Sequence, residues 1–72
     1  MKISARNVFK GKVVAIKVGA VNNEVTIDVG KGVQIVSVVT KESSENLGLA
    51  KGKIAYAIIK ASNVLIGTDG ED

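Results

Sequence analysis

Short stretches in which apolar and polar residues alternate, or in which β-branched residues run together, dominate this chain and predict β-strands. The clearest alternation covers residues 24–29, where valine and isoleucine occupy every second position. Side chains of a strand point alternately to the two faces of a sheet, so this pattern indicates a strand with one buried face. Five strands are predicted, at residues 12–18, 24–29, 33–40, 53–61 and 63–66.

Two local signals connect these strands. Gly30-Lys31-Gly32, between the second and third predicted strands, is typical of a tight hairpin. From Thr40 to Leu49 the pattern changes to cap-forming residues, acids in the first turns, and Gly48 placed to take a left-handed conformation while Leu49 packs back. We therefore predict one short helix of at most two turns between the third and fourth strands.

Three strands, a short helix and two more strands, without proline, match the element order of the OB-fold. We predict a mostly β domain over residues 1–67, folded as a five-stranded OB-like Greek-key barrel with one short helix. An SH3-like barrel is the alternative that five strands allow, although its helix is usually a single late turn. Residues 68–72 contain three acids and are expected to form a disordered acidic tail.

Several predicted strands are apolar on nearly both faces, which is more apolar surface than one small barrel can bury. A 72-residue chain is also of the size that is marginal alone, because it buries only about 60% of its unfolded surface. Large exposed apolar patches usually mark interfaces. The sequence therefore predicts a tight homo-oligomer.

The composition excludes several classes of function. The chain has no cysteine and no histidine, which removes disulfides, thiol chemistry and most transition-metal sites. The usual nucleophiles and proton shuttles are absent too, so we expect no enzyme, no metal ligands and no organic cofactor. No apolar run is long enough to cross a bilayer, and residues 1–7 lack the apolar core of a signal peptide, so we expect a cytoplasmic protein with no membrane partner.

The charge distribution favours an anionic partner. The net charge is +3, but three of the seven acids lie after residue 66, so residues 1–66 carry ten basic and four acidic side chains, a balance of +6. Such an excess of positive charge attracts anions without specifying their kind.

Lys60 lies in the middle of the most apolar run of the chain, residues 55–66. An ammonium group removed from water without a partner costs several kcal/mol. No acid occurs between Lys53 and Thr68, so we predict that a bound anion neutralises Lys60. The alternative is a lysine at a sheet edge whose stem is buried and whose amine reaches water.

Three clusters of hydrogen-bond donors could surround such an anion: Ser4 with Arg6, Thr40 with Ser43, and Lys60-Ala61-Ser62. Arginine matches the oxygen edge of an oxyanion, and hydroxyl groups at a helix start can point the same way. Each cluster also has an ordinary explanation, namely a solvated arginine, a helix cap and an exposed lysine. Together they supply two cations and several neutral donors without a nearby acid, which suits a small tetrahedral dianion.

Two other kinds of site do not fit. Gly30-Lys31-Gly32 is too short for a phosphate-cradling loop and lacks the Lys-Ser/Thr ending of a P-loop. Nucleic-acid binding by an OB-fold normally uses aromatic side chains for stacking, and the chain has only Phe9 and Tyr56.

The sequence resembles the molbindins, the small molybdate-binding Mop proteins. The motifs that carry this resemblance are spread from about residue 2 to residue 67: Ser-Ala-Arg-Asn at 4–7, Lys-Gly-Lys-Val-Val at 10–14, Gly-Ala-Val-Asn-Asn-Glu-Val at 19–25, Leu-Gly-Leu at 47–49 with Gly52, and Ile-Lys-Ala-Ser-Asn-Val-Leu-Ile at 59–66. The resemblance implies a Mop domain of OB-like fold that assembles as a hexamer, a trimer of dimers, and holds molybdate or tungstate at subunit interfaces.

By motif position, the resemblance implies anion contacts in this chain from Ser4, Arg6, Thr40, Ser43, Lys60 and the backbone of Ala61. It also implicates the loop of Gly19, Val21, Asn22 and Asn23 in a second class of site. The function implied is storage or homeostasis of molybdate, and of tungstate as well, by reversible binding. A nucleic-acid-binding OB module and a purely structural oligomerisation domain are the alternatives.

Overall fold

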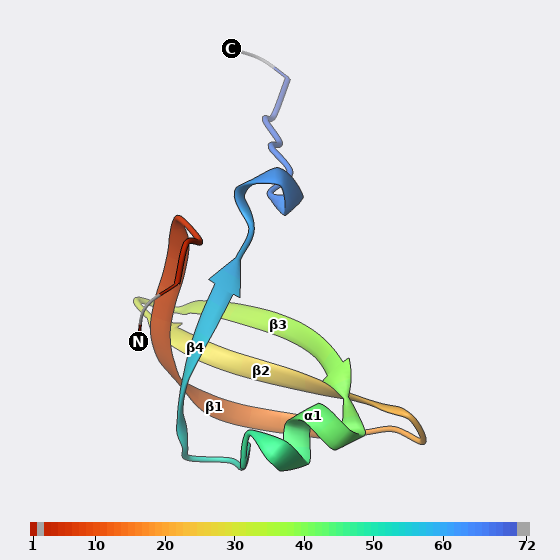
Figure 1. Ribbon diagram of the computed structural model, residues 1–72. Helices are drawn as coiled ribbons and strands as arrows, with labels where there is room; N and C mark the ends of the chain where they lie inside the picture. The colour runs from red at the N-terminus through yellow and green to blue at the C-terminus, as the bar shows by residue number, and fades with distance from the viewer. Residues whose placement is uncertain (2, 71–72) are drawn as a thin grey trace.

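The computed structural model describes residue 1 and residues 3–70. Its elements in chain order are β1 (Asn7–Val18), β2 (Asn22–Gly30), β3 (Val33–Thr40), α1 (Lys41–Asn46), β4 (Ile54–Ile59) and a 3-10 turn, η1 (Ala61–Asn63). The four strands form one antiparallel sheet in the order β3-β2-β1-β4, shown in Figure 1.

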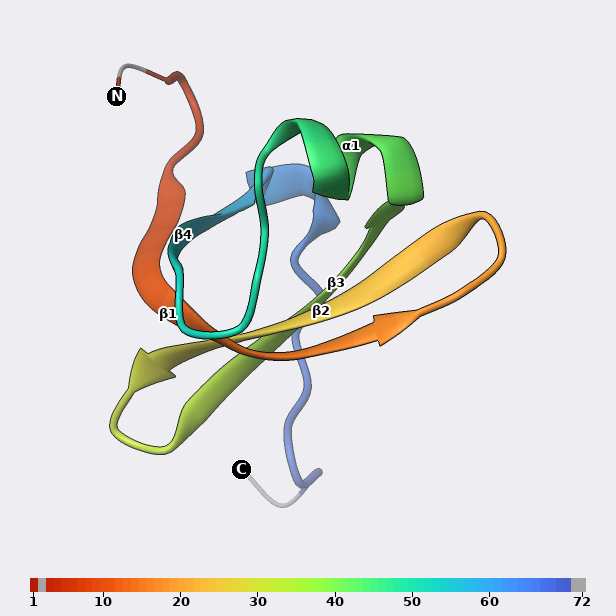
Figure 2. The same ribbon diagram turned by 90° about the horizontal axis from the view of Figure 1, so that it is seen from below.

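The long strand β1 organises the sheet because it pairs with two partners along its length. Its first half, from Asn7 to Lys12, pairs with β4, and its second half, from Lys12 to Val18, pairs with β2. The register shifts between Val13 and Ala15, where a bulge bends the strand. The sheet is consequently curled and strongly twisted, as Figure 2 shows from below.

The core lies on the inner face of this curled sheet. Val13, Val25, Ile27 and Ala57 are its buried apolar side chains, and Ile16, Ile35, Val39 and Leu49 are among those that pack against them. The alternation seen in the sequence of residues 24–29 thus reports burial directly, since Val25 and Ile27 point inward while Glu24 is exposed.

Much of the predicted architecture is confirmed. The chain is mostly β, with one short helix between the third and fourth strands, and β3 has the predicted bounds. The hairpin at Gly30-Lys31-Gly32 forms with Lys31 in a left-handed conformation (φ 54°). At the end of α1, Gly48 has φ 65° and the backbone amide of Leu49 donates to the carbonyl oxygen of Ser44 (3.0 Å), which closes the helix as expected.

The two ends of the sheet differ from the prediction. β1 begins at Asn7, five residues before the predicted strand. Lys10 and Gly11 interrupt the apolar pattern there, and the segment is extended because it pairs with β4, which comes much later in the sequence. β4 ends at Ile59, so residues 60 and 61, predicted to be strand, are not: Lys60 caps the 3-10 turn that starts at Ala61.

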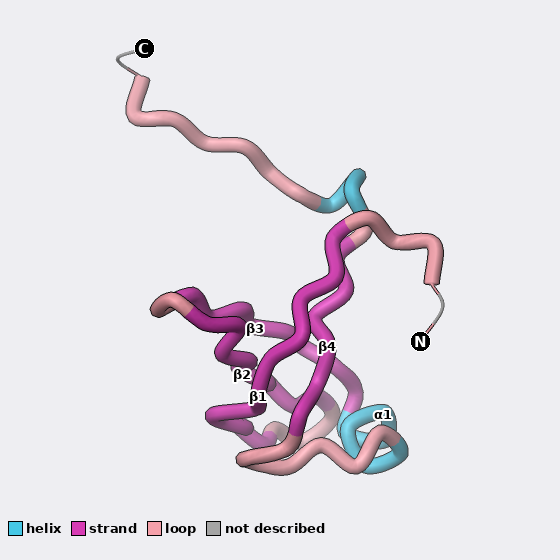
Figure 3. The backbone as a smooth tube through the Cα atoms, turned by 90° about the vertical axis from the view of Figure 1, so that its left-hand side faces the viewer, coloured by secondary structure: helices cyan, strands magenta, loops and turns pink. Residues whose placement is uncertain are grey.

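The predicted fifth strand does not form in this single chain. Residues 64–66 follow η1 as an extended segment with no strand partner and run away from the sheet (Figures 1 and 3). Their apolar side chains are left in solvent, with Leu65 93% and Ile66 91% exposed. Within the described residues, no helix has the length and apolar character needed to cross a lipid bilayer.

Candidate functional site

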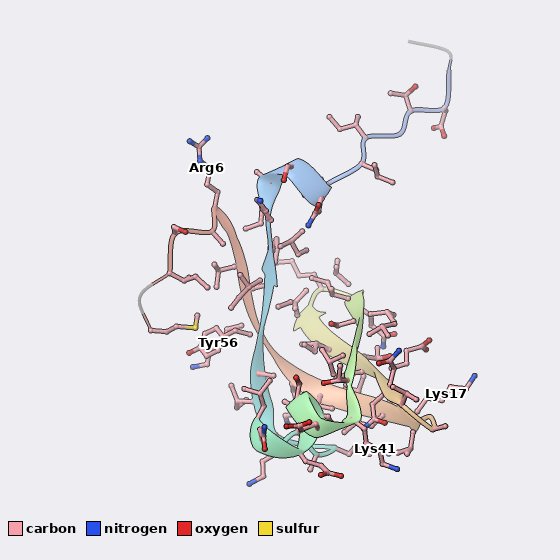
Figure 4. The ribbon with its side chains drawn as sticks, turned by 45° about the vertical axis from the view of Figure 1, so that its right-hand side comes forward. Arg6, Lys17, Lys41 and Tyr56 are labelled. Atoms are coloured by element: carbon pink, nitrogen blue, oxygen red, sulfur yellow. The ribbon has the colours of Figure 1, made fainter. Side chains whose placement is uncertain are left out.

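The side chains with the most suitable chemistry lie where the chain enters and leaves the β1–β4 pair. Residues 3–6, just before β1, form one wall of a hollow of about 420 Å³, and residues 60–62, just after β4, form the other. We call this the terminal hollow. In Figure 4, Arg6 lies beside the 3-10 turn, at the opposite end of β4 from α1.

Antiparallel pairing explains why these two segments meet. Asn7, the first residue of β1, is the register partner of Ile59, the last residue of β4. The side-chain amide of Asn7 also donates a hydrogen bond of 3.2 Å to the carbonyl oxygen of Ile59. Arg6 and Lys60 are the next residues outward on the two strands, so the end of the sheet places both cations at one hollow.

The lining of the terminal hollow suits an oxyanion. Of the predicted site residues it brings together Ser4, Arg6, Lys60 and Ala61, which supply a guanidinium, an ammonium, a hydroxyl and backbone. Among the described residues, no acidic side chain lines it. Donors and positive charge without a competing carboxylate are what an acceptor-only anion requires.

One prediction about Lys60 is wrong for the single chain. The side chain was expected among aliphatic neighbours within a strand, but it is exposed. The backbone leaves the sheet after Ile59, with Lys60 at φ −62° and ψ 131°, and the ammonium therefore reaches solvent at the rim of the terminal hollow. The need for a counterion consequently rests on the convergence of Lys60 with Arg6 and not on burial.

Thr40 and Ser43, the other predicted hydroxyl pair, do not lie in the terminal hollow. They form the N-terminal cap of α1, at the opposite end of the sheet in Figure 1. The backbone amide of Ser43 donates to Thr40 Oγ1 (3.0 Å), and the Thr40 hydroxyl donates to Ser43 Oγ (2.8 Å). Both residues are exposed, so the Ser43 hydroxyl proton is available to a group outside this chain.

The loop predicted as part of a second site lies near the helix end as well. Gly19, Val21 and Asn22 are exposed, while Asn23 is buried and accepts a hydrogen bond from the backbone amide of Gly19 through Oδ1 (3.4 Å). The carbonyl oxygen of Val21 accepts from the backbone amide of Lys41 (2.8 Å), which ties this loop to the start of α1. Lys17 and Lys41 both lie near this loop, with their side chains projecting in different directions (Figure 4).

The structure adds two residues to the predicted set, Ile3 and Ser62, which also line the terminal hollow. Ser62 stands in the third donor cluster of the sequence, Lys60-Ala61-Ser62. If residues 60–62 formed a strand, with side chains alternating between its two faces, Ala61 would point away from Lys60 and Ser62. The 3-10 turn instead brings all three to the same wall.

Comparisons with known proteins identify the family of this chain. The model of the TOBE domain family matches residues 3–66. A relative from Haemophilus influenzae, named probable molybdenum-pterin-binding protein, is 52% identical over 96% of this chain and 100% of its own length. Among solved structures, MopII from Clostridium pasteurianum superposes with a TM-score of 0.88 at 40% identity, covering 93% of this chain and 100% of that chain.

A third similar protein carries the ligand. The cytoplasmic molybdate-binding protein ModG, solved with molybdate bound, matches with a TM-score of 0.80 at 59% identity. The match covers 85% of this chain and 43% of the ModG chain. The present chain therefore corresponds to less than half of that protein.

Proposed function

The chain belongs to the TOBE domain family, as the similarity to Mop proteins also shows, and on this premise we propose that it binds molybdate reversibly. The observation that carries the proposal is that Arg6 and Lys60 line one hollow that no acid among residues 3–70 lines. No bond is made or broken in this function. Tungstate, a tetrahedral dianion of the same charge, is expected to bind as well.

The terminal hollow offers chemistry that matches a tetrahedral dianion. The Arg6 guanidinium can donate two parallel hydrogen bonds, the Lys60 ammonium supplies a compact second charge, and the Ser4 hydroxyl and the Ala61 amide add neutral donors. Charge-assisted hydrogen bonds contribute roughly 1.5 to 3 kcal/mol each. The protein acts in the cytoplasm, in storage or homeostasis of the anion; the location is supported by a relative described as a cytoplasmic molybdate-binding protein.

A second copy of the chain completes the binding site. Thr40 and Ser43 lie at the helix end of the sheet, too far along it to serve the terminal hollow of their own chain. Their exposed hydroxyls can reach an anion held by a neighbouring copy. Each site thus takes Ser4, Arg6, Lys60 and Ala61 from one chain and Thr40 with Ser43 from another.

The sheet itself supports such an assembly. β3 and β4 are its two edges, and between them lies an apolar groove of about 390 Å³ lined by Ile27, residues 35–37 and residues 56–59. The exposed segment 64–66 is apolar and points away from its own sheet. Placed in the groove of a second copy, it supplies the fifth strand and closes an OB-like barrel.

We propose that dimers formed in this way associate further into a hexamer, a trimer of dimers. Exposed apolar side chains remain outside the groove, including Val18, Val21 and Val38 near the β1–β2 turn. The loop of Gly19, Val21, Asn22 and Asn23, with Lys17 and Lys41 beside it, is where a second class of anion site would form between dimers. No nucleic-acid partner is part of this proposal.

Equilibrium dialysis against molybdate, with sulfate and phosphate as competitors, tests the function. The wild-type protein binds molybdate, and Lys60→Ala weakens binding at least about tenfold while leaving the fold intact. Lys31→Ala, at the exposed hairpin far from the terminal hollow, is the matched control and keeps wild-type affinity. A protein that binds single-stranded oligonucleotide with steep salt dependence, or that assembles and binds neither ligand, contradicts the proposal.

A further inference from the structure

The terminal hollow contains a hydroxyl group that the proposed contacts do not use. Ser62 lies in η1 and lines the same wall as Lys60, and Ser4 lines the opposite wall. We propose that Ser62 is a further anion-binding residue, whose hydroxyl donates a hydrogen bond to the bound molybdate. This inference rests on the proposed function and extends it to a residue outside the contacts that motif position implies.

The hydroxyl of Ser62 is free to donate. Side-chain hydrogen bonds between described residues engage the hydroxyls of Thr40, Ser43 and Thr68, but not that of Ser62. The residue is exposed in the single chain, so its donor is lost to no internal partner. A hydroxyl on a residue that lines a hollow with two cations matches an oxyanion, whose oxygens only accept.

The position of Ser62 is set by the same turn that sets Lys60. The backbone amide of Asn63 donates to the carbonyl oxygen of Lys60 (2.8 Å), and the amide of Val64 donates to that of Ala61 (3.2 Å). These two bonds hold residues 60–63 in a tight turn. The backbones of Lys60 and Ser62 are therefore held together on one wall of the hollow.

With Ser62, each wall of the hollow has one cation and one hydroxyl group. Residues 3–6 bring a guanidinium and the Ser4 hydroxyl, whereas on the other wall the side chain of Ala61 is only a methyl group. Without Ser62, Lys60 is the single side-chain donor of that wall. A tetrahedral anion directs oxygens toward both walls, so a hydroxyl on each side gives it a cation and a neutral donor from either direction.

The test uses three variants of the full chain: Ser62→Ala, Ser62→Thr and Thr68→Ala. Thr68 lies outside the hollow, where its Oγ1 accepts from the backbone amide of Gly70 (3.2 Å), so its substitution controls for loss of an exposed hydroxyl. Titration calorimetry with sodium molybdate gives the affinity, and light scattering with circular dichroism confirms that assembly and fold are unchanged. Ser62→Ala is expected to bind about tenfold more weakly, while Ser62→Thr and Thr68→Ala stay within about threefold of wild type.

The outcomes separate this inference from the function on which it rests. If the wild type binds molybdate and Ser62→Ala binds it equally well, the role of Ser62 is overturned and the proposed function stands. If Ser62→Thr is as weak as Ser62→Ala, the hydroxyl is not the group that matters, which also overturns the inference. If the wild type itself does not bind molybdate, both proposals fail.

Discussion

The side-chain amide of Asn7 donates a hydrogen bond of 3.2 Å to the carbonyl oxygen of Ile59, across the register pair that closes the end of the sheet. Arg6 and Lys60 are the next residues on the two strands. The register pairs of β1 and β4 therefore set where the backbones of the two cations lie, and the Asn7 side chain adds a hydrogen bond at the last of these pairs. This relationship makes Asn7 a positioning residue for the terminal hollow.

Asn7→Ala is expected to lower the free energy of unfolding by about 1 kcal/mol, because one partly buried hydrogen bond is lost. It should also weaken molybdate about threefold or more, since the ends of β1 and β4 can then move apart. Urea unfolding and calorimetry measure the two effects. Asn46→Ala, at the exposed end of α1, is the control. Lower stability with unchanged affinity would limit Asn7 to a purely structural role.

Gly11→Ala is expected to destabilise the sheet. A Cβ atom at position 11 would lie 2.4 Å from the carbonyl oxygen of Asp28 and 2.7 Å from Cγ2 of Ile27, so backbone must shift to admit it. Overpacking of this kind costs about 1 to 3 kcal/mol. Gly67→Ala, which meets nothing within 4 Å, is the matched control. Equal midpoints of denaturant unfolding for the two variants would contradict this account of β1.

The parts of the fold that the sequence predicted are those decided by short-range rules. Alternation identified residues 24–29 because one face of that strand is buried, and an apolar run rich in β-branched residues identified residues 33–40. The Gly30-Lys31-Gly32 hairpin and the closure of α1 at Gly48 follow from residues that tolerate positive φ. Each of these signals depends on residues within a few positions of each other.

The parts that sequence reasoning missed depend on distant partners. The segment of β1 from Asn7 to Gly11 has no strand-like alternation, and it is extended because β4 pairs with it. The apolar run around Lys60 did not reveal that the strand ends at Ile59 and that a 3-10 turn follows. Residues 64–66 are apolar and have no strand partner among the described residues of their own chain. Their prediction as the fifth strand of a single-chain barrel was therefore wrong.

The candidate site likewise has features that local sequence predicted and features that depend on distant pairing. Residue chemistry alone singled out Ser4 with Arg6, Thr40 with Ser43, and Lys60, and motif resemblance supplied the reason to combine them. The β1–β4 register, which sequence does not reveal, decides that the first pair and Lys60 share a hollow and that Thr40 and Ser43 do not. Ser62 stood in the third donor cluster but not among the contacts that motif position implies, and the 3-10 turn places it with Lys60 and Ala61 on one wall.

A site shared between copies predicts complementation between two weak variants. Lys60→Ala removes a contact from one side of the site and Ser43→Ala removes a contact from the other, so each alone should weaken every site. In a mixed dimer, one site carries both defects and the other carries neither. Co-expressed subunits carrying different affinity tags, purified as the mixed species, should recover wild-type affinity at about half of the sites. Mixed species as weak as either parent would contradict a shared site.

Leu65→Asp combined with Ile66→Asp is expected to prevent assembly. These side chains are 93% and 91% exposed in the single chain, so a monomer loses nothing by the change. In the groove between β3 and β4 of a second copy, each new carboxylate would have to leave water for an apolar surface, which costs several kcal/mol. Light scattering should therefore report monomer where the wild type reports an oligomer, and molybdate affinity should fall with it because Thr40 and Ser43 of the neighbour are lost.

The matched control for that variant is Thr68→Asp, which adds a carboxylate to the same exposed tail beyond the apolar segment. It should assemble and bind molybdate as the wild type does, since the groove receives only residues 64–66. An unchanged oligomer in the double Leu65 and Ile66 variant would show that this segment lies outside the interface. A monomer that retains wild-type affinity would instead show that one copy suffices for binding, and the terminal hollow would then be complete without Thr40 and Ser43.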